Sequence, residues 1–213
     1  MNSPAEKPFL SSHSVYLRPI NESDVTSGLW HQWYNDYELT RYNSHGVFPI
    51  NQDDQLSYFR DNQSNASNIS LAICDVSDDS LIGNCSLTNI DLLNRKAEIT
   101  CTIGVNNSQT AGLEAIGIMV GHGFERLCLN RIYGGAHEGL EQWIKMMAAL
   151  GFEQEGIFRG DIHRNNNFFD TLRFGLLNDK YRALLKERDG RYLFNSAGEL
   201  YKEALRQLKP AKN

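Results

Sequence analysis

The chain has 213 residues, of which 41% are hydrophobic and 22% are charged, a composition typical of soluble globular proteins. At roughly 150 residues per domain, this length predicts one compact domain with some elaboration. No apolar run approaches the ~20 residues that a membrane span requires, and the first residues, MNSPAEKPFL, lack the apolar core of a signal peptide. We therefore expect a cytoplasmic protein with no membrane partner.

The net charge of −5 is unevenly distributed along the chain. Residues 1–179 carry 12 Lys and Arg against 22 Asp and Glu, whereas residues 180–213 carry 9 against 4. Because residues 1–179 carry a net negative charge, they offer no positively charged surface for the phosphates of a nucleic acid, so no nucleic-acid partner is expected. The four cysteines form no C-x-x-C pair and the six histidines show no metal-ligand spacing. The cysteines are therefore expected as small core residues in a reducing compartment, and no metal site is predicted.

The first half of the chain is predicted to contain strands and two helices. The expected elements are a strand at 15–20, a helix begun by Asn21 or Ser23, a second helix begun by Asn51, and strands at 69–75, 81–89 and 97–105. Residues 40–49 and 61–68 are expected to be loops. The three consecutive strands are typical of an antiparallel meander.

The strand at 97–105 is the most informative of these elements. Its odd positions are apolar, which places Glu98, Thr100 and Thr102 together on the other face. One face therefore belongs to the core, and the other is either solvated or functional. A carboxylate midway along a strand is usually a solvated surface residue, and a catalytic role for Glu98 is the alternative.

The second half is predicted to contain a core helix at 109–127, a strand at 131–136, a helix at 140–150, strands at 156–159 and 168–177, and two added helices at 181–186 and 196–208. This order predicts an α+β fold with helices on both sides of a mixed sheet. We expect a domain over residues 1–178 and a C-terminal helical extension over 179–213. The last helix is amphipathic, so its apolar face must pack on its own domain or on a second copy, and a homodimer is a hypothesis.

A helix that begins directly after a strand forms a site for an anion. Residues 107–112 hold that position between the strand at 97–105 and the core helix. The unpaired N–H groups and the positive end of the helix dipole both favour phosphate there. Small and polar residues are also common at plain loop-to-helix joints, so both interpretations stay open.

Several local sequences occur in an order and spacing that point to a known family. They are YLRPI at 16–20, LIGNCSL at 81–87, AEI at 97–99, EA at 114–115 leading to GFERLCLNRI at 123–132, and ALGFEQEG at 149–156. From Tyr16 to about Leu177 the sequence resembles the GNAT superfamily of N-acetyltransferases, and within it the ribosomal-protein and amino-sugar acetyltransferases. The resemblance implies a GNAT-like mixed, mostly antiparallel sheet flanked by helices.

The resemblance implies that acetyl-CoA, as cosubstrate, lies in a cleft where the strand ending near Ile103 splays from the strand at 131–136. Its pyrophosphate would sit on backbone N–H groups at 108–113. The cofactor-binding residues that it implies are Ile103, Val105, Ser108, Gln109, Thr110, Ala111, Gly112, Leu113 and His137. The family's catalytic groups would be a backbone N–H near Ile103, which holds the thioester oxygen, and Glu98, which takes the amine's proton through water. Met147 stands where many relatives keep a tyrosine as the thiolate's acid, so that acid is unassigned.

Two segments depart from the family's pattern. The phosphate loop reads Q/R-x-x-G-x-G/A in relatives, and the best register here, at 107–112, keeps only the final small residue. Leu140 and Trp143 stand where relatives carry an asparagine and a serine that contact the CoA chain. These departures motivate an alternative from another class, a non-catalytic binding or assembly protein with a degenerate CoA site.

Acceptor binding in this family comes from the first helices and from the loop before the last strand. The candidate substrate-binding residues are Tyr34, Arg41, Tyr42, His163 and Asp170. The alternatives are a solvated His163 and a turn or capping role for Asp170, and Trp33 nearby is expected in the core. The leading hypothesis is acetyl transfer by direct attack of a primary amine, with a nucleotide-linked amino sugar as acceptor. A protein N-terminus of the ribosomal-protein type is the next candidate, and a polyamine or antibiotic is a weaker one.

Overall fold

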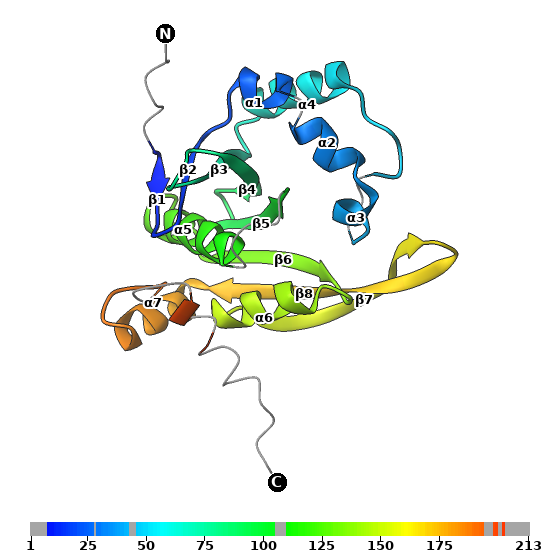
Figure 1. Cartoon of the computed structure of the whole chain (residues 1–213). Coiled ribbons are helices and arrows are strands. Elements are labelled where there is room, and N and C mark those ends of the chain that lie inside the picture. The colour runs from blue at the N-terminus through cyan, green and yellow to red at the C-terminus, as the bar shows by residue number, and fades with distance from the viewer. Residues whose placement is uncertain are drawn as a thin grey trace.

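The computed structural model describes residues 8–27, 29–42, 46–104, 110–193, 198–199 and 202. Within them the strands form one sheet in the order β1-β2-β3-β4-β5-β6-β8-β7, in which every neighbouring pair is antiparallel except β5 and β6 (Figure 1). The strands are β1 Leu10–Ser11, β2 Val15–Pro19, β3 Ile69–Asp75, β4 Leu81–Asp91, β5 Lys96–Ile103, β6 Arg131–His137, β7 Glu153–Arg164 and β8 Asn167–Leu177. The α+β prediction with a mixed, mostly antiparallel sheet is confirmed.

Helices cover both faces of this sheet, as the sequence predicted. They are α1 Glu22–Thr26, α2 Leu29–Asn35, α3 Tyr37–Thr40, α4 Gln52–Ser64, α5 Ala111–Glu125, α6 Glu141–Ala149 and α7 Asn178–Glu187. None of these described helices combines the length and the apolarity that a membrane crossing requires.

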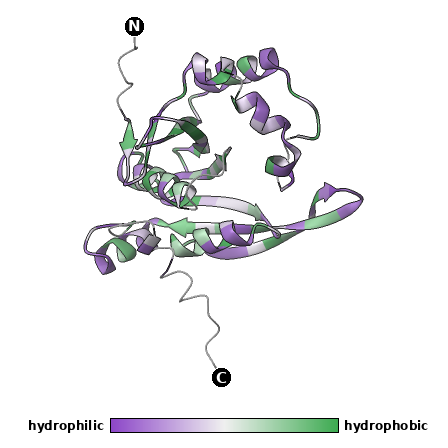
Figure 2. Cartoon of the chain, in the orientation of Figure 1, coloured by the Kyte–Doolittle hydropathy of each residue, from purple (hydrophilic) through white to green (hydrophobic). Residues whose placement is uncertain are grey.

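Helix α5 forms the centre of the main core. It packs on β2, β4 and β5, and its buried residues include Leu113, Ile116, Met119 and Val120, which are fully buried. The apolar face of β5 meets this helix, because alternate residues of a strand point to one side. In Figure 2 the tip of the β7–β8 hairpin is hydrophilic, whereas the C-terminal end of β8 is hydrophobic. The core therefore lies away from the projecting hairpin.

The opposite face of β2 and β3 carries a second, smaller core. Helices α1, α2 and α4 form a layer there, and Val25, Trp30, Trp33 and Phe59 are buried beneath them. The expectation that Trp33 is a core aromatic is confirmed. This layer lies over the polar face of β4 and β5, so it covers any site on that face.

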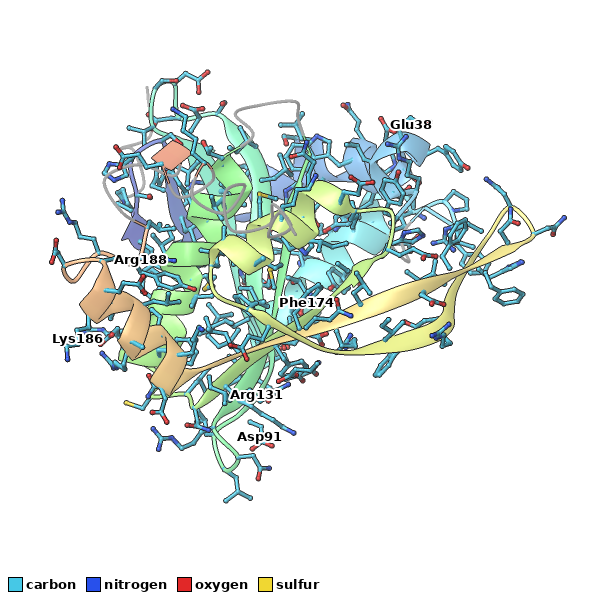
Figure 3. The ribbon with its side chains drawn as sticks, turned by 90° about the horizontal axis from the view of Figure 1, so that it is seen from below. Glu38, Asp91, Arg131, Phe174, Lys186 and Arg188 are labelled. Carbon is cyan, nitrogen blue, oxygen red and sulfur yellow. The ribbon has the colours of Figure 1, made fainter. Side chains whose placement is uncertain are left out.

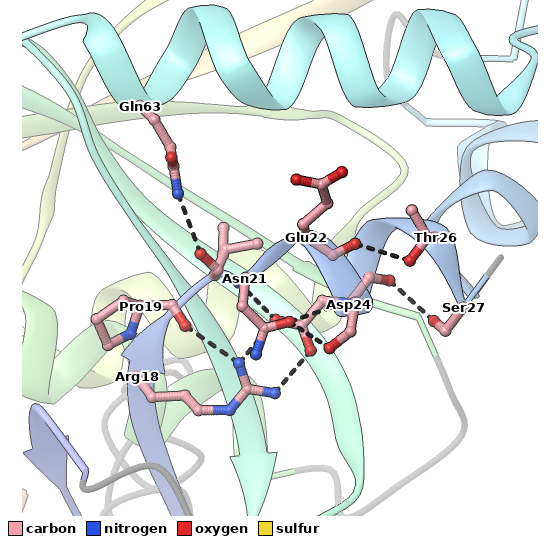
Figure 4. Close-up of polar contacts among 10 residues, drawn as sticks. Arg18, Pro19, Asn21, Glu22, Asp24, Thr26, Ser27 and Gln63 are labelled. Atoms are coloured by element: carbon pink, nitrogen blue, oxygen red, sulfur yellow. Dashed lines mark hydrogen bonds and ion pairs between the residues drawn. The ribbon is translucent and has the colours of Figure 1, made fainter. Parts of the chain in front are cut away.

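A buried ion pair joins β2 to this helical layer (Figure 4). Arg18 donates two hydrogen bonds of 2.7 Å to the two carboxylate oxygens of Asp24, which is 7% exposed. Asp24 also accepts from the Asn21 N–H while the Asn21 side chain accepts from the Asp24 N–H, which completes a capping box. The predicted cap at Asn21 is confirmed, and the ion pair fixes where α1 leaves the sheet.

Several element predictions need correction. Residues 61–64 belong to α4, which begins after its predicted cap Asn51, so the expected loop at 61–68 starts later. The single helix expected after Asn21 is two helices, α1 and α2, and the short elements β1 and α3 were not predicted. Strand β7 is longer than the expected 156–159, because irregular register lets it follow β8 through two bulged positions.

The described part of the C-terminal extension packs on its own domain. Tyr181 of α7 lies against Phe124 of α5, with ring centroids 4.8 Å apart. Arg188 donates to the carbonyl oxygen of Ala149 at the end of α6, where the helix dipole favours a cation. Figure 3 shows Lys186 and Arg188 at the end of the molecule opposite the β7–β8 hairpin. The helix expected at 196–208, and with it the homodimer hypothesis, falls almost wholly outside the described residues.

Candidate active site

The sheet opens between β5 and β6, as the resemblance implies. The two strands pair in parallel only at three positions, the last of which joins Glu98 to Tyr133. Beyond this point β5 continues to Ile103 and β6 continues to His137, each without the other as a partner. The edge of β5 that faces β6 therefore presents backbone groups that β6 does not pair.

The hydrogen-bonding pattern between β4 and β5 decides which backbone groups of β5 face this opening. Ile103 is opposite Gly83 of β4, and the N–H of the next residue, Gly104, donates to the Ile82 carbonyl oxygen at 2.8 Å. This pattern defines Ile103 and Gly83 as a non-hydrogen-bonded pair, in which the N–H and C=O of each residue point away from the other strand. The Ile103 N–H therefore points into the opening, where a thioester oxygen would meet it.

The N-terminus of α5 lies beside the end of β5. Thr110 is the N-cap of this 15-residue helix, and a Cβ atom on Gly112 would lie 3.5 Å from the Ile103 side chain. The first N–H groups of a helix have no partner within the helix, and the dipole adds positive potential. An unpaired strand edge for an extended chain and a helix N-terminus for phosphate together fit acetyl-CoA.

A cavity of about 560 Å³ lies between the helical layer and the polar face of β3, β4 and β5. This volume lies in the usual range for small-molecule sites. Its lining contains no charged side chain within the described residues; the lining residues are Pro19, Ile20, Trp30, Tyr34, Tyr58, Phe59, Asn62, Gln63, Asn68, Ile69, Ser70, Asn84, Ser86, Thr88, Thr100 and Thr102. The cavity is therefore a neutral pocket rich in hydroxyl and amide groups, and it adjoins the end of β5.

Tyr34, a predicted substrate-binding residue, lies in the wall of this pocket. Its hydroxyl lies 3.5 Å from Asn84 Oδ1 and also hydrogen-bonds the Thr102 side chain. Burial, and then the neighbouring Tyr58 hydroxyl, raise the pKa of Tyr34 to about 12. The hydroxyl therefore keeps its proton at neutral pH and acts as a hydrogen-bond donor.

Glu98 lies where β5 and β6 still pair, on the same face as the pocket but outside its lining. One carboxylate oxygen accepts from Arg173 at 3.3 Å and the other from Asn89 at 3.2 Å. Arg173 in turn stacks on Phe158 and on Tyr133. Both carboxylate oxygens are thus held at the last residue pair before the opening, and the role of Glu98 as base stays a prediction.

Tyr42 and His137 bring the segment after α3 and the end of β6 into contact. The Tyr42 ring packs on His137 at the end of β6, with centroids 5.0 Å apart, and Phe169 packs on the same imidazole. His137 is 4% exposed, and its Nδ1 accepts from the Gly139 N–H at 2.9 Å, so the neutral ring carries its proton on Nε2. Burial lowers the pKa of His137. These two predicted site residues therefore form one aromatic cluster at the end of β6.

Of the other predicted substrate residues, only Arg41 contacts this aromatic cluster, from its exposed side. Arg41 is exposed, pairs with Glu38 at 2.5 Å and stacks on Tyr42. His163 is exposed on the β7–β8 hairpin, and Asp170 accepts from the Gly160 N–H within the irregular part of β7. Solvent exposure for His163 and a turn role for Asp170 are the alternatives that the geometry favours.

Three predicted cofactor residues, Val105, Ser108 and Gln109, lie outside the described residues. Leu140 and Trp143 stand where relatives of the GNAT family carry residues that contact the CoA chain. Trp143 is partly buried and packs against the main core. Leu140 is the N-cap of α6 and makes no side-chain capping bond. No three His, Cys, Asp or Glu side chains gather as a candidate metal site in the part of the chain that the structure describes.

Most of the pocket lining was not predicted. Thr100 and Thr102 were placed on the functional face of β5, but Asn84, Ser86 and Thr88 on β4 were not. The same alternation was available in LIGNCSLT, where polar residues at 84, 86 and 88 alternate with apolar ones. The residues from α4 carried no such signal, because only the folded chain brings that helix over the sheet.

Comparison with known proteins agrees with this geometry. The family model described as acetyltransferase (GNAT) domain matches residues 14–153. An uncharacterized N-acetyltransferase, p20, of Bacillus licheniformis is 28% identical over 155 residues, which are 70% of this chain and 86% of that protein. The probable N-acetyltransferase YjcK of Bacillus subtilis is 25% identical over 179 residues, 79% of this chain and 97% of that protein.

Solved structures show the same fold. The spermidine N-acetyltransferase from Vibrio cholerae, in complex with CoA and spermine, superposes with a TM-score of 0.71 at 19% identity over 79% of this chain and 98% of that chain. A probable acetyltransferase superposes with a TM-score of 0.67 at 25% identity over 80% of this chain and 96% of that chain. The chain belongs to the GNAT family of acetyltransferases. It is an acetyl-CoA-dependent N-acetyltransferase, which replaces the non-catalytic alternative.

Proposed function

We propose that the acceptor is a primary amine on a hydroxyl-rich sugar, of the amino-sugar class, with a nucleotide-linked amino sugar, whose charged diphosphate lies outside the uncharged pocket, as the first candidate. The observation that carries this proposal is the uncharged pocket beside β5, whose polar groups are hydroxyls and amides. Such groups both donate and accept hydrogen bonds, which matches the hydroxyls of a sugar. Trp30, Tyr58 and Phe59 supply apolar surface for the ring.

A polyamine is a poorer fit to the same pocket. The relative from Vibrio cholerae acts on spermidine, a chain with several cationic amines. Cations taken out of water need carboxylates nearby, and none lines the described pocket. Glu98, a carboxylate on the same face but outside the lining, is engaged by Arg173. The pocket chemistry therefore favours a single reacting amine on a neutral body.

The absence of charged side chains from the described pocket lining also favours the acetyl transfer. An ammonium group is disfavoured in an uncharged pocket, so the amine is held in its neutral, nucleophilic form. Bound acetyl-CoA supplies the acetyl group as a thioester. The Ile103 N–H, directed into the opening, donates to the thioester oxygen as negative charge develops there. Glu98 takes the amine's proton through a water molecule as the amide bond forms.

The test is a substrate comparison with the purified full-length protein. Acetyl-CoA consumption is measured with a nucleotide-linked amino sugar, a free hexosamine, spermidine and a short peptide with a free N-terminus. We expect kcat/KM to be higher for one of the two amino sugars than for spermidine by about 10²-fold or more, which corresponds to about 2.7 kcal/mol. A preference for spermidine or for the peptide overturns the proposal.

The variant Asn84→Asp tests whether the charge of the pocket decides between the amino sugar and spermidine. It places one carboxylate in the pocket without changing the size of the side chain. We expect this variant to raise KM for the amino sugar and to lower KM for spermidine. Gln52→Glu is the matched control, since residue 52 is exposed at the start of α4 and does not line the pocket. Equal effects of the two substitutions would mean that the pocket does not bind the acceptor.

A further inference from the structure

Two cysteines face each other across β4 and β5. Cys85 is opposite Cys101, two residues along the ladder from the Gly83 and Ile103 pair, in a register that is regular over this stretch. The two cysteines therefore also form a non-hydrogen-bonded pair, in which the Cα atoms lie about 4.5 Å apart. Disulfides need Cα atoms roughly 4.4 to 6.8 Å apart, so the backbone already permits a bond. Both residues are free thiols.

The side chains also lie on the same face of the sheet. Both point to the α5 side, where Cys85 is fully buried in the main core and Cys101 packs against that core. Burial, and then the neighbouring Cys101 thiol, raise the pKa of Cys85. Cys74 and Cys128 differ from this pair, because the residues opposite Cys74 in the sheet are Tyr16 and Leu81, and Cys128 is an exposed residue after α5.

The cleft between β5 and β6 gives access to this pair. Cys85 is fully buried, whereas Cys101 is only partly buried. Cys101 lies in the part of β5 that pairs with β4 on one side and, beyond the Glu98 and Tyr133 pair, with no described strand on the other, which is the side of the opening. Because Cys101 is the less buried of the two, we expect a small molecule in the cleft to reach it before Cys85, and acetyl-CoA in the same cleft to cover it.

We propose that Cys85 and Cys101 are an oxidisable dithiol in the wall of the acetyl-CoA cleft, converted by a peroxide to a disulfide and shielded by the bound cosubstrate. The Cys101 sulfur attacks one peroxide oxygen, which gives a sulfenic acid and, from hydrogen peroxide, one water. The Cys85 sulfur then attacks the Cys101 sulfur, and the hydroxyl leaves as water with the Cys85 proton. Two thiols and one peroxide thus give one disulfide and two waters.

The experiment uses the full-length protein carrying Cys128→Ser, treated with hydrogen peroxide and followed by intact mass and peptide mapping. We expect the protein to lose two hydrogen atoms, to regain them with dithiothreitol, and to yield one cross-linked peptide pair that contains Cys85 and Cys101. Acetyl-CoA at ten times its dissociation constant leaves about one cleft in eleven empty, so the reaction should slow about tenfold.

Cys85→Ala and Cys101→Ala, each in the same background, are the matched controls and should show no cross-link. With Cys85→Ala, peroxide should instead add oxygen to Cys101, because the resolving thiol is gone. Oxygen addition without a cross-link in the unaltered pair overturns the proposal. A disulfide that forms equally fast with and without acetyl-CoA contradicts the placement of the pair in the cleft wall, whichever amine the enzyme acetylates.

Discussion

The indole ring of Trp33 lies directly on the backbone of Gly104, at the end of β5. A Cβ atom on Gly104 would come within 1.9 Å of the Trp33 ring, closer than real Cβ contacts allow. Gly104 follows Ile103, whose N–H faces the opening, so helix α2 packs on the end of β5 that borders the opening. This contact joins the helical layer over the pocket to the edge of β5 that borders the opening.

Gly104→Ala should therefore destabilise the protein by about 1–3 kcal/mol, the usual cost of overpacking, and weaken acetyl-CoA binding by moving the end of β5. Urea unfolding and calorimetry measure the two effects. The double variant with Trp33→Leu should cost less than the sum of the single variants. Gly156→Ala is the control, because a Cβ atom there meets nothing within 4 Å. Equal losses at the two glycines would mean that the Trp33 contact is unimportant.

Glu98→Gln tests the base. Glutamine keeps the size of the side chain and one acceptor for Arg173, so the fold should survive. If the carboxylate takes the amine's proton, kcat should fall about 10²- to 10⁴-fold. Steady-state kinetics at saturating acetyl-CoA measure the change. A loss of only two- or threefold would leave Glu98 with the purely structural role that its contacts with Arg173 and Asn89 also support.

Asp24→Asn should destabilise the protein by about 3 kcal/mol, because it leaves the Arg18 guanidinium, whose side chain is only 12% exposed, poorly paired. Thermal or urea unfolding measures the loss. The control is Glu22→Gln two residues away, which breaks the exposed ion pair with Arg60. That change should cost less than about 1 kcal/mol. Similar losses in the two variants would contradict the view that the Arg18 and Asp24 pair holds α1 on the sheet.

His137 should make the protein less stable in mild acid. Burial lowers its pKa in the folded state, so the unfolded chain binds a proton more readily. The stability that neutral His137 contributes is fully present above the pKa of the unfolded chain, roughly 6.5, and is lost as the pH falls through the lower folded value.

His137→Asn should therefore weaken the dependence of stability on pH below about 6.5, while keeping an acceptor for the Gly139 N–H. The measurement is the free energy of unfolding at several pH values between 5 and 8 for both proteins. The slope, not the absolute stability, is the readout, because the substitution also removes the ring contacts with Tyr42 and Phe169. Identical slopes would contradict the prediction.

The sequence by itself determined the strands and helices whose periodicity is strong. Alternation placed Glu98, Thr100 and Thr102 on one face of β5, and the helix at 109–127 was recognised from its apolar spacing and confirmed as α5. The cap at Asn51 also followed from local chemistry, because an asparagine side chain satisfies a helix N–H only a few residues away. Such patterns involve residues close together in the chain, so they can be recognised from the sequence without knowledge of the fold.

Only the tertiary structure decided what meets across the site. The Trp33 contact with Gly104, the meeting of Tyr42 with His137 and the pocket beneath α4 all join residues distant in sequence. The opening between β5 and β6 was expected from family resemblance, but the direction of the Ile103 N–H depends on which residues pair between β4 and β5. A shift of one residue in that register would turn the same N–H toward β4, and periodicity along a single strand carries no information about its partner.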